Sequence, residues 1–117
     1  MSRSLARPTE RPDGRTVEIR LLYFEGCPHW RTMHDHIREA LGAEGMQSVE
    51  PILVRVETQE EAERLSFTGS PTILVDGRDP FGAAEDFYGL TCRLYDTPYG
   101  RSGTPTVEQI RSALRLA

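Results

Sequence analysis

The sequence predicts a single α/β domain with a mixed β-sheet. Patterns typical of strands and helices follow one another in the order β-α-β-α-β-β-α, which indicates helices layered on a sheet. The run "VEIRLLYF" at residues 17–24 becomes apolar on both faces in its second half, as is typical of a buried central strand. The chain of 117 residues has the length of one domain, so we expect one folded unit.

The first residues differ in composition from the rest of the chain. Residues 1–15 are polar, contain proline and show no apolar period, which predicts a disordered N-terminal tail. No internal repeat follows this tail. The folded domain is therefore expected to occupy residues 16–117.

Three helices are predicted from apolar spacing and from signals at their ends. The first carries an apolar stripe and ends near Gly42 or Gly45. Its stripe consists of Trp30, Met33, Ile37 and Leu41. Thr58 and Glu61 have the spacing of a capping box for the second helix. Pro105 fits the first position of the third helix.

Two further strands are clear in the sequence, and one is weak. "PILVRV" at residues 51–56 is rich in β-branched residues, and "TILV" at 72–75 is a short apolar run before a turn. "TCRLY" at 91–95 alternates weakly, which predicts an edge strand antiparallel to 72–75. Residues 77–90 show no period, and their aromatic residues indicate a flap packed over the core.

Composition excludes several classes of function. The net charge of −4 supplies no basic field for phosphate backbones, so we expect no nucleic-acid partner. All 14 basic residues are arginine, so Schiff-base and lysine-nucleophile chemistry are excluded. The sequence contains neither an apolar stretch of about 20 residues nor an apolar N-terminal signal region. We therefore expect a cytoplasmic protein without a membrane partner.

Cys27 is the candidate nucleophile. It lies in "FEGCPHW", residues 24–30, where the predicted first strand gives way to the first helix. A thiolate at a helix N-terminus meets unpaired N–H groups, which lower a thiol pKa from about 8.5 to roughly 3.5–7.5. His29, when protonated, would add a positive charge, and Pro28 would begin the helix without blocking the thiol. We expect a reactive, partly exposed Cys27; the alternative is a small buried apolar residue.

The chain resembles the thioredoxin-like family over residues 17–116. The element order, Cys27 at the start of the first helix and "SPT" at 70–72 before the third strand carry this resemblance. Pro71 follows Cys27 by 44 residues, which is the usual spacing in that family. The resemblance implies a four-stranded mixed sheet of order 2-1-3-4 with three helices on its two faces. It also implies a cis bond before Pro71 that turns Ser70 toward the thiol.

The same resemblance assigns roles to residues around the thiol. It implies catalytic roles for Cys27 and His29 and substrate binding by Pro28, Trp30, Ser70, Pro71 and Thr72. "CPH" resembles the Cys-Pro-His-Cys site of disulfide oxidases, whose second cysteine resolves the mixed disulfide. Trp30 stands in place of that second cysteine, so the resolving thiol would come from another molecule.

Cys92, His34 and His36 are expected to play no part in this chemistry. If residues 91–95 pair antiparallel with 72–75, Cys92 lies at the end of the sheet away from Cys27. A disulfide requires Cα atoms within about 7 Å, so we predict a semi-buried structural cysteine. The chain has no CxxC motif and its three histidines lack the spacing of helical ligands, so we predict no structural metal site.

Three functions stay open, and whether the chain is an enzyme is left undecided. The first is a monothiol oxidoreductase, in which Cys27 attacks a small or protein disulfide or an oxidised thiol. A low-molecular-weight thiol would be its co-substrate, with no other cofactor. The second is a non-catalytic thioredoxin-fold binding or scaffold protein, working as a homodimer.

The third function is organomercurial or soft-metal handling by thiols, which requires Cys27 and Cys92 to converge. "GSPTILVDGRDPF" and "GLTCRLY" resemble segments of small bacterial thioredoxin-like proteins that are sometimes grouped with organomercurial lyases. The expected separation of the two cysteines makes this the weakest of the three.

Overall fold

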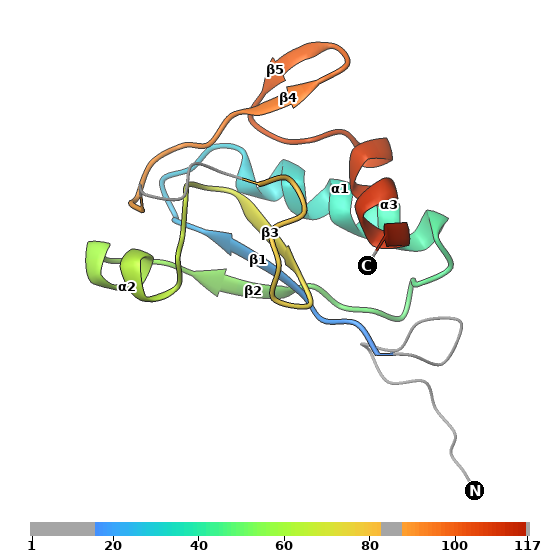
Figure 1. Cartoon of the computed structure of the whole chain (residues 1–117), viewed down its shortest axis with the longest axis horizontal. Coiled ribbons are helices and arrows are strands. Elements are labelled where there is room, and N and C mark those ends of the chain that lie inside the picture. The colour runs from blue at the N-terminus through green and yellow to red at the C-terminus, as the bar shows by residue number, and fades with distance from the viewer. Residues whose placement is uncertain (1–15, 83–87, 117) are drawn as a thin grey trace, which may run out of the picture.

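The computed structural model describes residues 16–82 and 88–116, which form an α/β structure (Figure 1). A mixed sheet of three strands has the order β2-β1-β3, and β4 and β5 pair separately. The strands are β1 Ile19–Tyr23, β2 Ile52–Arg55, β3 Thr72–Val75, β4 Tyr95–Thr97 and β5 Gly100–Ser102. The helices are α1 Trp30–Ala43, α2 Gln59–Arg64 and α3 Val107–Leu116.

β1 is the central strand, as its apolar sequence predicts. It runs parallel to β2 and antiparallel to β3, and Leu21 is paired with both Leu53 and Ile73. Successive side chains of a strand point to opposite faces, so Leu21 and Leu22 enter different cores. A strand that is buried on both faces requires helices on both sides of the sheet.

The three helices provide this cover. α1 and α3 pack side by side on one face, and α2 lies on the other (Figure 1). The fully buried residues of the larger core include Ile19, Leu21, Met33, Ile37, Ile73, Ile110 and Leu114. The smaller core consists of Leu22, Val56, Ala62 and Phe67. This arrangement leaves the start of α1 beside the carboxyl end of β1.

Capping boxes begin α2 and α3. The Thr58 side chain accepts the N–H of Glu61 at 3.0 Å, as predicted, and the Glu61 carboxylate accepts the N–H of Glu57 at 2.7 Å. At α3, Thr106 and Gln109 exchange reciprocal bonds of 3.1 and 2.9 Å. The side-chain cap is therefore Thr106, one residue after the proline that was predicted to begin this helix.

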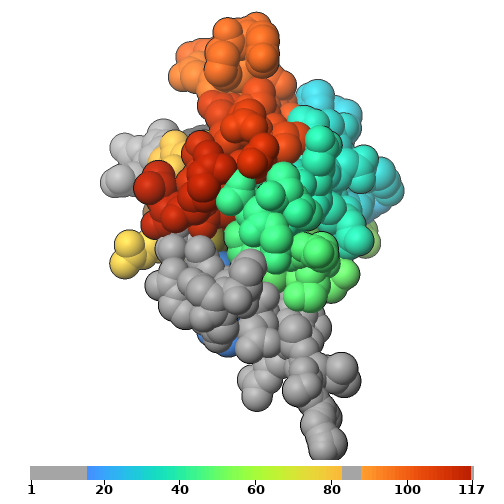
Figure 2. Space-filling view, turned by 90° about the vertical axis from the view of Figure 1, so that its right-hand side faces the viewer, coloured from blue at the N-terminus to red at the C-terminus, as the bar shows by residue number. Residues whose placement is uncertain are grey.

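The edge strand predicted at residues 91–95 is not formed. The ladder contact of this segment is a parallel bridge between Cys92 and Ser70, which precedes β3. The chain then forms the β4–β5 hairpin, which projects from the body beyond α1 and α3 (Figure 2). Within residues 16–82 and 88–116, the strand order 2-1-3-4 is therefore not observed.

A tight turn joins β4 to β5. Gly100 adopts a positive φ of 110°, which an L side chain rarely adopts, and Thr97 accepts the N–H of Tyr99 at 3.1 Å. These local contacts pair Tyr95 with Ser102 rather than with a residue of β3.

Two other predictions concern segments at the edge of the described structure. The tail at residues 1–15 and residues 83–87 of the predicted flap lie outside the described residues. Phe81 of the flap packs on the larger core, edge-to-face with Tyr95 at a ring-centroid distance of 5.5 Å. Among the described helices, none has the length and apolar character needed to cross a membrane.

Candidate functional site

Cys27 lies in the turn between β1 and α1, and its sulfur contacts two backbone groups. The sulfur accepts the N–H of His29 at 3.4 Å, and the thiol donates to the carbonyl oxygen of Ser70 at 3.6 Å. His29 is the residue that precedes α1, so the helix start contacts the sulfur as predicted. Only 3% of Cys27 is exposed, so the prediction of a partly exposed thiol is wrong.

The backbone of Ser70 is fully engaged within the chain. The bond between Ser70 and Pro71 is cis, as predicted. The Ser70 N–H donates to the carbonyl of Thr91 at 2.8 Å, and its carbonyl accepts the N–H of Arg93 at 2.9 Å as well as the Cys27 thiol. The resemblance to the thioredoxin-like family implied that a substrate would bind at Ser70. Residues 91–93 of the same chain occupy that place instead.

Cys92 lies beside Cys27, which corrects the prediction that the two cysteines are at opposite ends of the sheet. The bridge from Cys92 to Ser70 joins backbones at about the strand spacing of 4.8 Å, and the Cys27 sulfur contacts the same Ser70. Both thiols are reduced, and Cys92 is exposed. The prediction failed because the segment pairs in parallel with residues before β3, not antiparallel with β3 itself.

The proximity of the two thiols changes the acidity of Cys92. Desolvation raises the pKa of Cys92 most, and the charge of Cys27 and a hydrogen bond with Cys27 raise it further. A hydrogen bond that favours the protonated form means that the Cys92 thiol donates to the Cys27 sulfur. The pair therefore favours the protonated form of Cys92.

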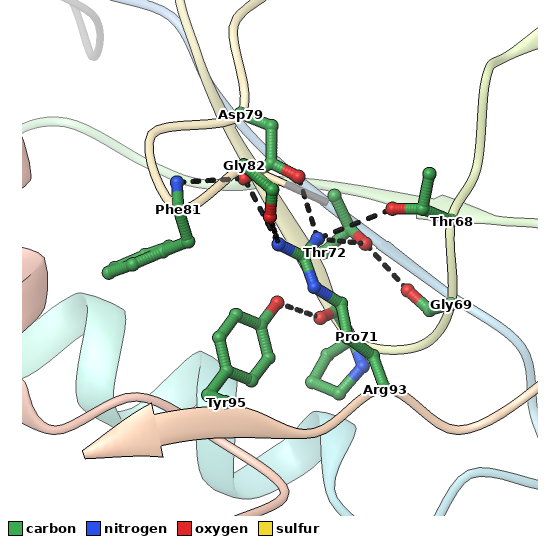
Figure 3. Close-up of polar contacts among 9 residues, drawn as sticks. All are labelled: Thr68, Gly69, Pro71, Thr72, Asp79, Phe81, Gly82, Arg93 and Tyr95. Carbon is green, nitrogen blue, oxygen red and sulfur yellow. Dashed lines mark hydrogen bonds and ion pairs between the residues drawn. The ribbon is translucent and has the colours of Figure 1, made fainter. Parts of the chain in front are cut away.

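A buried arginine holds the Cys92 segment against the body (Figure 3). Arg93 is 7% exposed, and its guanidinium forms an ion pair with Asp79 at 2.6 Å. It also donates to Thr72 at 3.1 Å, to Thr68 at 3.4 Å and to the carbonyl of Gly82 at 2.5 Å. These bonds compensate for the burial of the charge, since a buried cation requires an anion and further acceptors.

Tyr95 and Gly69 complete this attachment. The Tyr95 hydroxyl donates to the carbonyl of Pro71, and the Arg93 guanidinium lies 4.5 Å from the Tyr95 ring centroid (Figure 3). Gly69 has a φ of +129°, and a Cβ there would lie 2.9 Å from the Cβ of Arg93. Glycine is required at this position because the segment approaches its backbone too closely for a side chain.

The other four predicted site residues lie in different surroundings. Thr72 is buried and supports Arg93, and Pro28 is exposed at the start of α1. The imidazole of His29 packs against Gly103, so the backbone rather than the ring of His29 contacts the sulfur. Trp30 is buried and stacks on Tyr23 with ring centroids 4.1 Å apart, so its indole belongs to the core.

Sequence reasoning missed the roles of Arg93, Asp79 and Tyr95. In a weakly alternating segment, an arginine is usually expected to face solvent. The one available signal was that each charge is next to apolar residues, Asp79 before "PF" and Arg93 before "LY". Their pairing is not local, so spacing could not reveal it.

No family model, curated protein or solved structure matches the chain. The site must therefore be interpreted from its own geometry. Among the residues that the structure describes, no group of three or more His, Cys, Asp or Glu side chains is arranged to hold a metal ion. The two thiols are the groups with nucleophilic character in this cluster.

We predict that Arg93→Ala lowers the free energy of unfolding by about 3 kcal/mol, because it leaves Asp79 without its buried partner. Urea denaturation would measure this change. Arg101→Ala is the matched control, since the Arg101–Asp96 pair is exposed on both sides, and it should cost less than about 0.5 kcal/mol. Equal effects of the two substitutions would contradict an anchoring role for Arg93.

We also predict that Cys27→Ala lowers the pKa of Cys92. Removal of the Cys27 charge and hydrogen bond deletes two of the causes that raise this pKa, while desolvation remains. At a fixed pH below the pKa, Cys92 should therefore be alkylated faster in the variant. Iodoacetamide labelling of the Cys92 peptide across a pH series would measure the shift. An unchanged profile would mean that the two thiols do not interact in solution.

Proposed function

We propose that the chain is a thioredoxin-like thiol–disulfide oxidoreductase whose nucleophile is Cys27. The observation that carries this proposal is the contact of the Cys27 sulfur with the N–H of His29 at the start of α1. An N–H donor and the positive end of a helix stabilise a thiolate, which is the nucleophilic form of cysteine. The Cys92 thiol lies close to the same sulfur, and its interaction with Cys27 is one of the causes of the raised pKa of Cys92.

The thioredoxin-like architecture is also part of the proposal. The elements from β1 to β3, with α3 at the end of the chain, have the order expected for that family. Residues 91–97 would take the place of its fourth strand, in a variant where pairing is reduced to the bridge between Cys92 and Ser70. The buried attachment of Arg93 supports this placement, because it fixes the segment without a ladder of backbone bonds.

In the proposed reaction, the Cys27 thiolate attacks one sulfur of a substrate disulfide. A new S–S bond forms between Cys27 and that sulfur, and the other substrate sulfur leaves as a thiolate that takes a proton from solvent. The substrate class we infer is a small disulfide rather than an extended protein segment. A protein strand would require the Ser70 backbone groups, which residues 91–93 already use.

The test is reaction of the reduced protein with bis(2-hydroxyethyl) disulfide, followed by intact mass and peptide mapping. We predict that Cys27→Ser abolishes formation of the mixed disulfide. Cys92→Ser is the matched control, because it removes the other thiol of the pair and should still form the adduct at Cys27. If Cys27→Ser reacted as well as the wild type, the nucleophile would be misassigned. A non-catalytic binding or scaffold role would then be favoured.

A second candidate function is binding of a soft metal ion or an organomercurial by the two thiols. The convergence of Cys27 and Cys92, which this function requires, is the observation that favours it. Two thiolates with no third ligand suit ions such as Hg²⁺ or Cu⁺ rather than Zn²⁺, which prefers four ligands.

We predict that the reduced protein binds one Hg²⁺ per chain and retains no Zn²⁺ under the same conditions. Thiolate-to-metal charge-transfer absorption during titration would measure the stoichiometry. Cys27→Ser and Cys92→Ser should each weaken Hg²⁺ binding, because both sulfurs are ligands in this arrangement. Binding that survives unchanged in Cys92→Ser would contradict a two-thiol site.

A further inference from the structure

We propose that Cys92 is the resolving cysteine for Cys27, so that catalysis closes a Cys27–Cys92 disulfide within the chain. This inference rests on the proposed function and replaces the external resolving thiol that the sequence predicted. It makes the protein a dithiol oxidoreductase whose second thiol comes from a distant segment rather than from the first turn of α1.

The geometry brings both thiols to one backbone residue. The Cys27 thiol contacts the carbonyl oxygen of Ser70 at 3.6 Å, and Cys92 is the residue bridged to Ser70. The bonds of Ser70 with Thr91 and Arg93 flank Cys92 on both sides and fix its register opposite Ser70. A one-residue shift of this pairing would move Cys92 away from the thiol it faces.

The two thiols differ in the way that a nucleophile and a resolving thiol require. Cys27 is buried and accepts an N–H bond, whereas Cys92 is exposed and has a raised pKa. Before reaction, Cys92 stays protonated and donates to the Cys27 sulfur. After Cys27 forms a mixed disulfide, its electrostatic effect on Cys92 and its hydrogen bond with Cys92 are lost, so two of the causes that raise the pKa of Cys92 disappear. The thiolate of Cys92 then becomes easier to form when it is needed.

Arg93 acts as a positioning residue for Cys92. Its side chain is buried against Asp79 and Thr72, while the side chain of the preceding residue is exposed. Neighbouring side chains of an extended segment point to opposite sides, so anchoring Arg93 inward holds Cys92 on the side of Cys27. The ion pair thereby limits the distance that the resolving thiol must travel.

The resolving step balances in atoms and electrons. Cys92 loses its proton to solvent, and its thiolate attacks the Cys27 sulfur of the mixed disulfide. The Cys27–Cys92 bond forms as the bond from Cys27 to the substrate sulfur breaks, and the substrate leaves as a second thiol after protonation. The substrate disulfide is reduced by two electrons and the protein dithiol is oxidised by two. Two molecules of a low-molecular-weight thiol would return the protein to its reduced form and become a disulfide.

The experiment adds one equivalent of 5,5′-dithiobis(2-nitrobenzoate) to the reduced protein and measures the coloured thionitrobenzoate released. Ring closure in the wild type should release two anions per reagent molecule and leave a protein that lacks two hydrogen atoms and carries no adduct. Peptide mapping should show Cys27 linked to Cys92. Cys92→Ser should release one anion, half the wild-type yield, and keep the adduct at Cys27. Arg101→Ala, an exposed substitution on β5 that retains both thiols, should behave as the wild type.

The results separate this inference from the proposed function. A stable adduct at Cys27 in the wild type, with one anion released, would overturn the resolving role and leave Cys27 as a monothiol nucleophile. A failure of Cys27 to react in either protein would instead overturn the proposed function itself. An adduct at Cys92 that Cys27 resolves would reverse the assigned roles and equally contradict the proposal.

The positioning role of Arg93 has its own readout. In Arg93→Met, release of the first anion should be at least as fast as in the wild type, while release of the second should be slower. Asp79→Asn removes the charge of the same ion pair but keeps the shape of the side chain. It replaces Arg93→Met in this test if Arg93→Met does not fold. Ring closure at the wild-type rate in a folded variant of either residue would show that the anchor does not position Cys92.

Discussion

The buried ion pair between Arg93 and Asp79 is the interaction on which the site depends. The guanidinium is shielded from water and takes its acceptors from three parts of the chain, namely Thr68, Thr72 on β3 and the turn that holds Asp79 and Gly82. Because these segments are separate in the sequence, the charge is fully satisfied only when they are brought together around the guanidinium. The backbone around Arg93 is then held against Ser70, and the neighbouring cysteine reaches the start of α1.

The sequence predicted the parts of the fold that local signals determine. β1, β3 and the three helices were predicted because their apolar periods and the Thr58 capping pattern lie within a few residues. The predicted edge strand at 91–95 failed because alternation reports burial and not the identity of the pairing partner. Cys92 was misplaced for the same reason, since its position depends on an ion pair between residues 14 apart with no regular element joining them.

The sequence predicted which residues surround Cys27, but it did not predict the role of Trp30. Cys27, Ser70 and Pro71 were identified from their positions in the element order, and the structure brings them together. The residue three positions after Cys27 was interpreted as a lost partner thiol, yet its indole stacks on Tyr23 as part of the core. A large aromatic residue there fills volume under the helix start, while the second thiol near Cys27 comes from residue 92 on another segment.

Because residues 91–93 pair with Ser70, they compete with any other strand for the same backbone N–H and carbonyl groups. A tethered segment meets its binding site at an effective concentration on the order of millimolar, without the loss of translational freedom that an incoming chain would undergo. A foreign strand would have to displace this segment, and a strand that binds weakly would not do so. The Ser70 backbone groups are therefore closed to a foreign strand, and their cover opposes edge-to-edge pairing at this position.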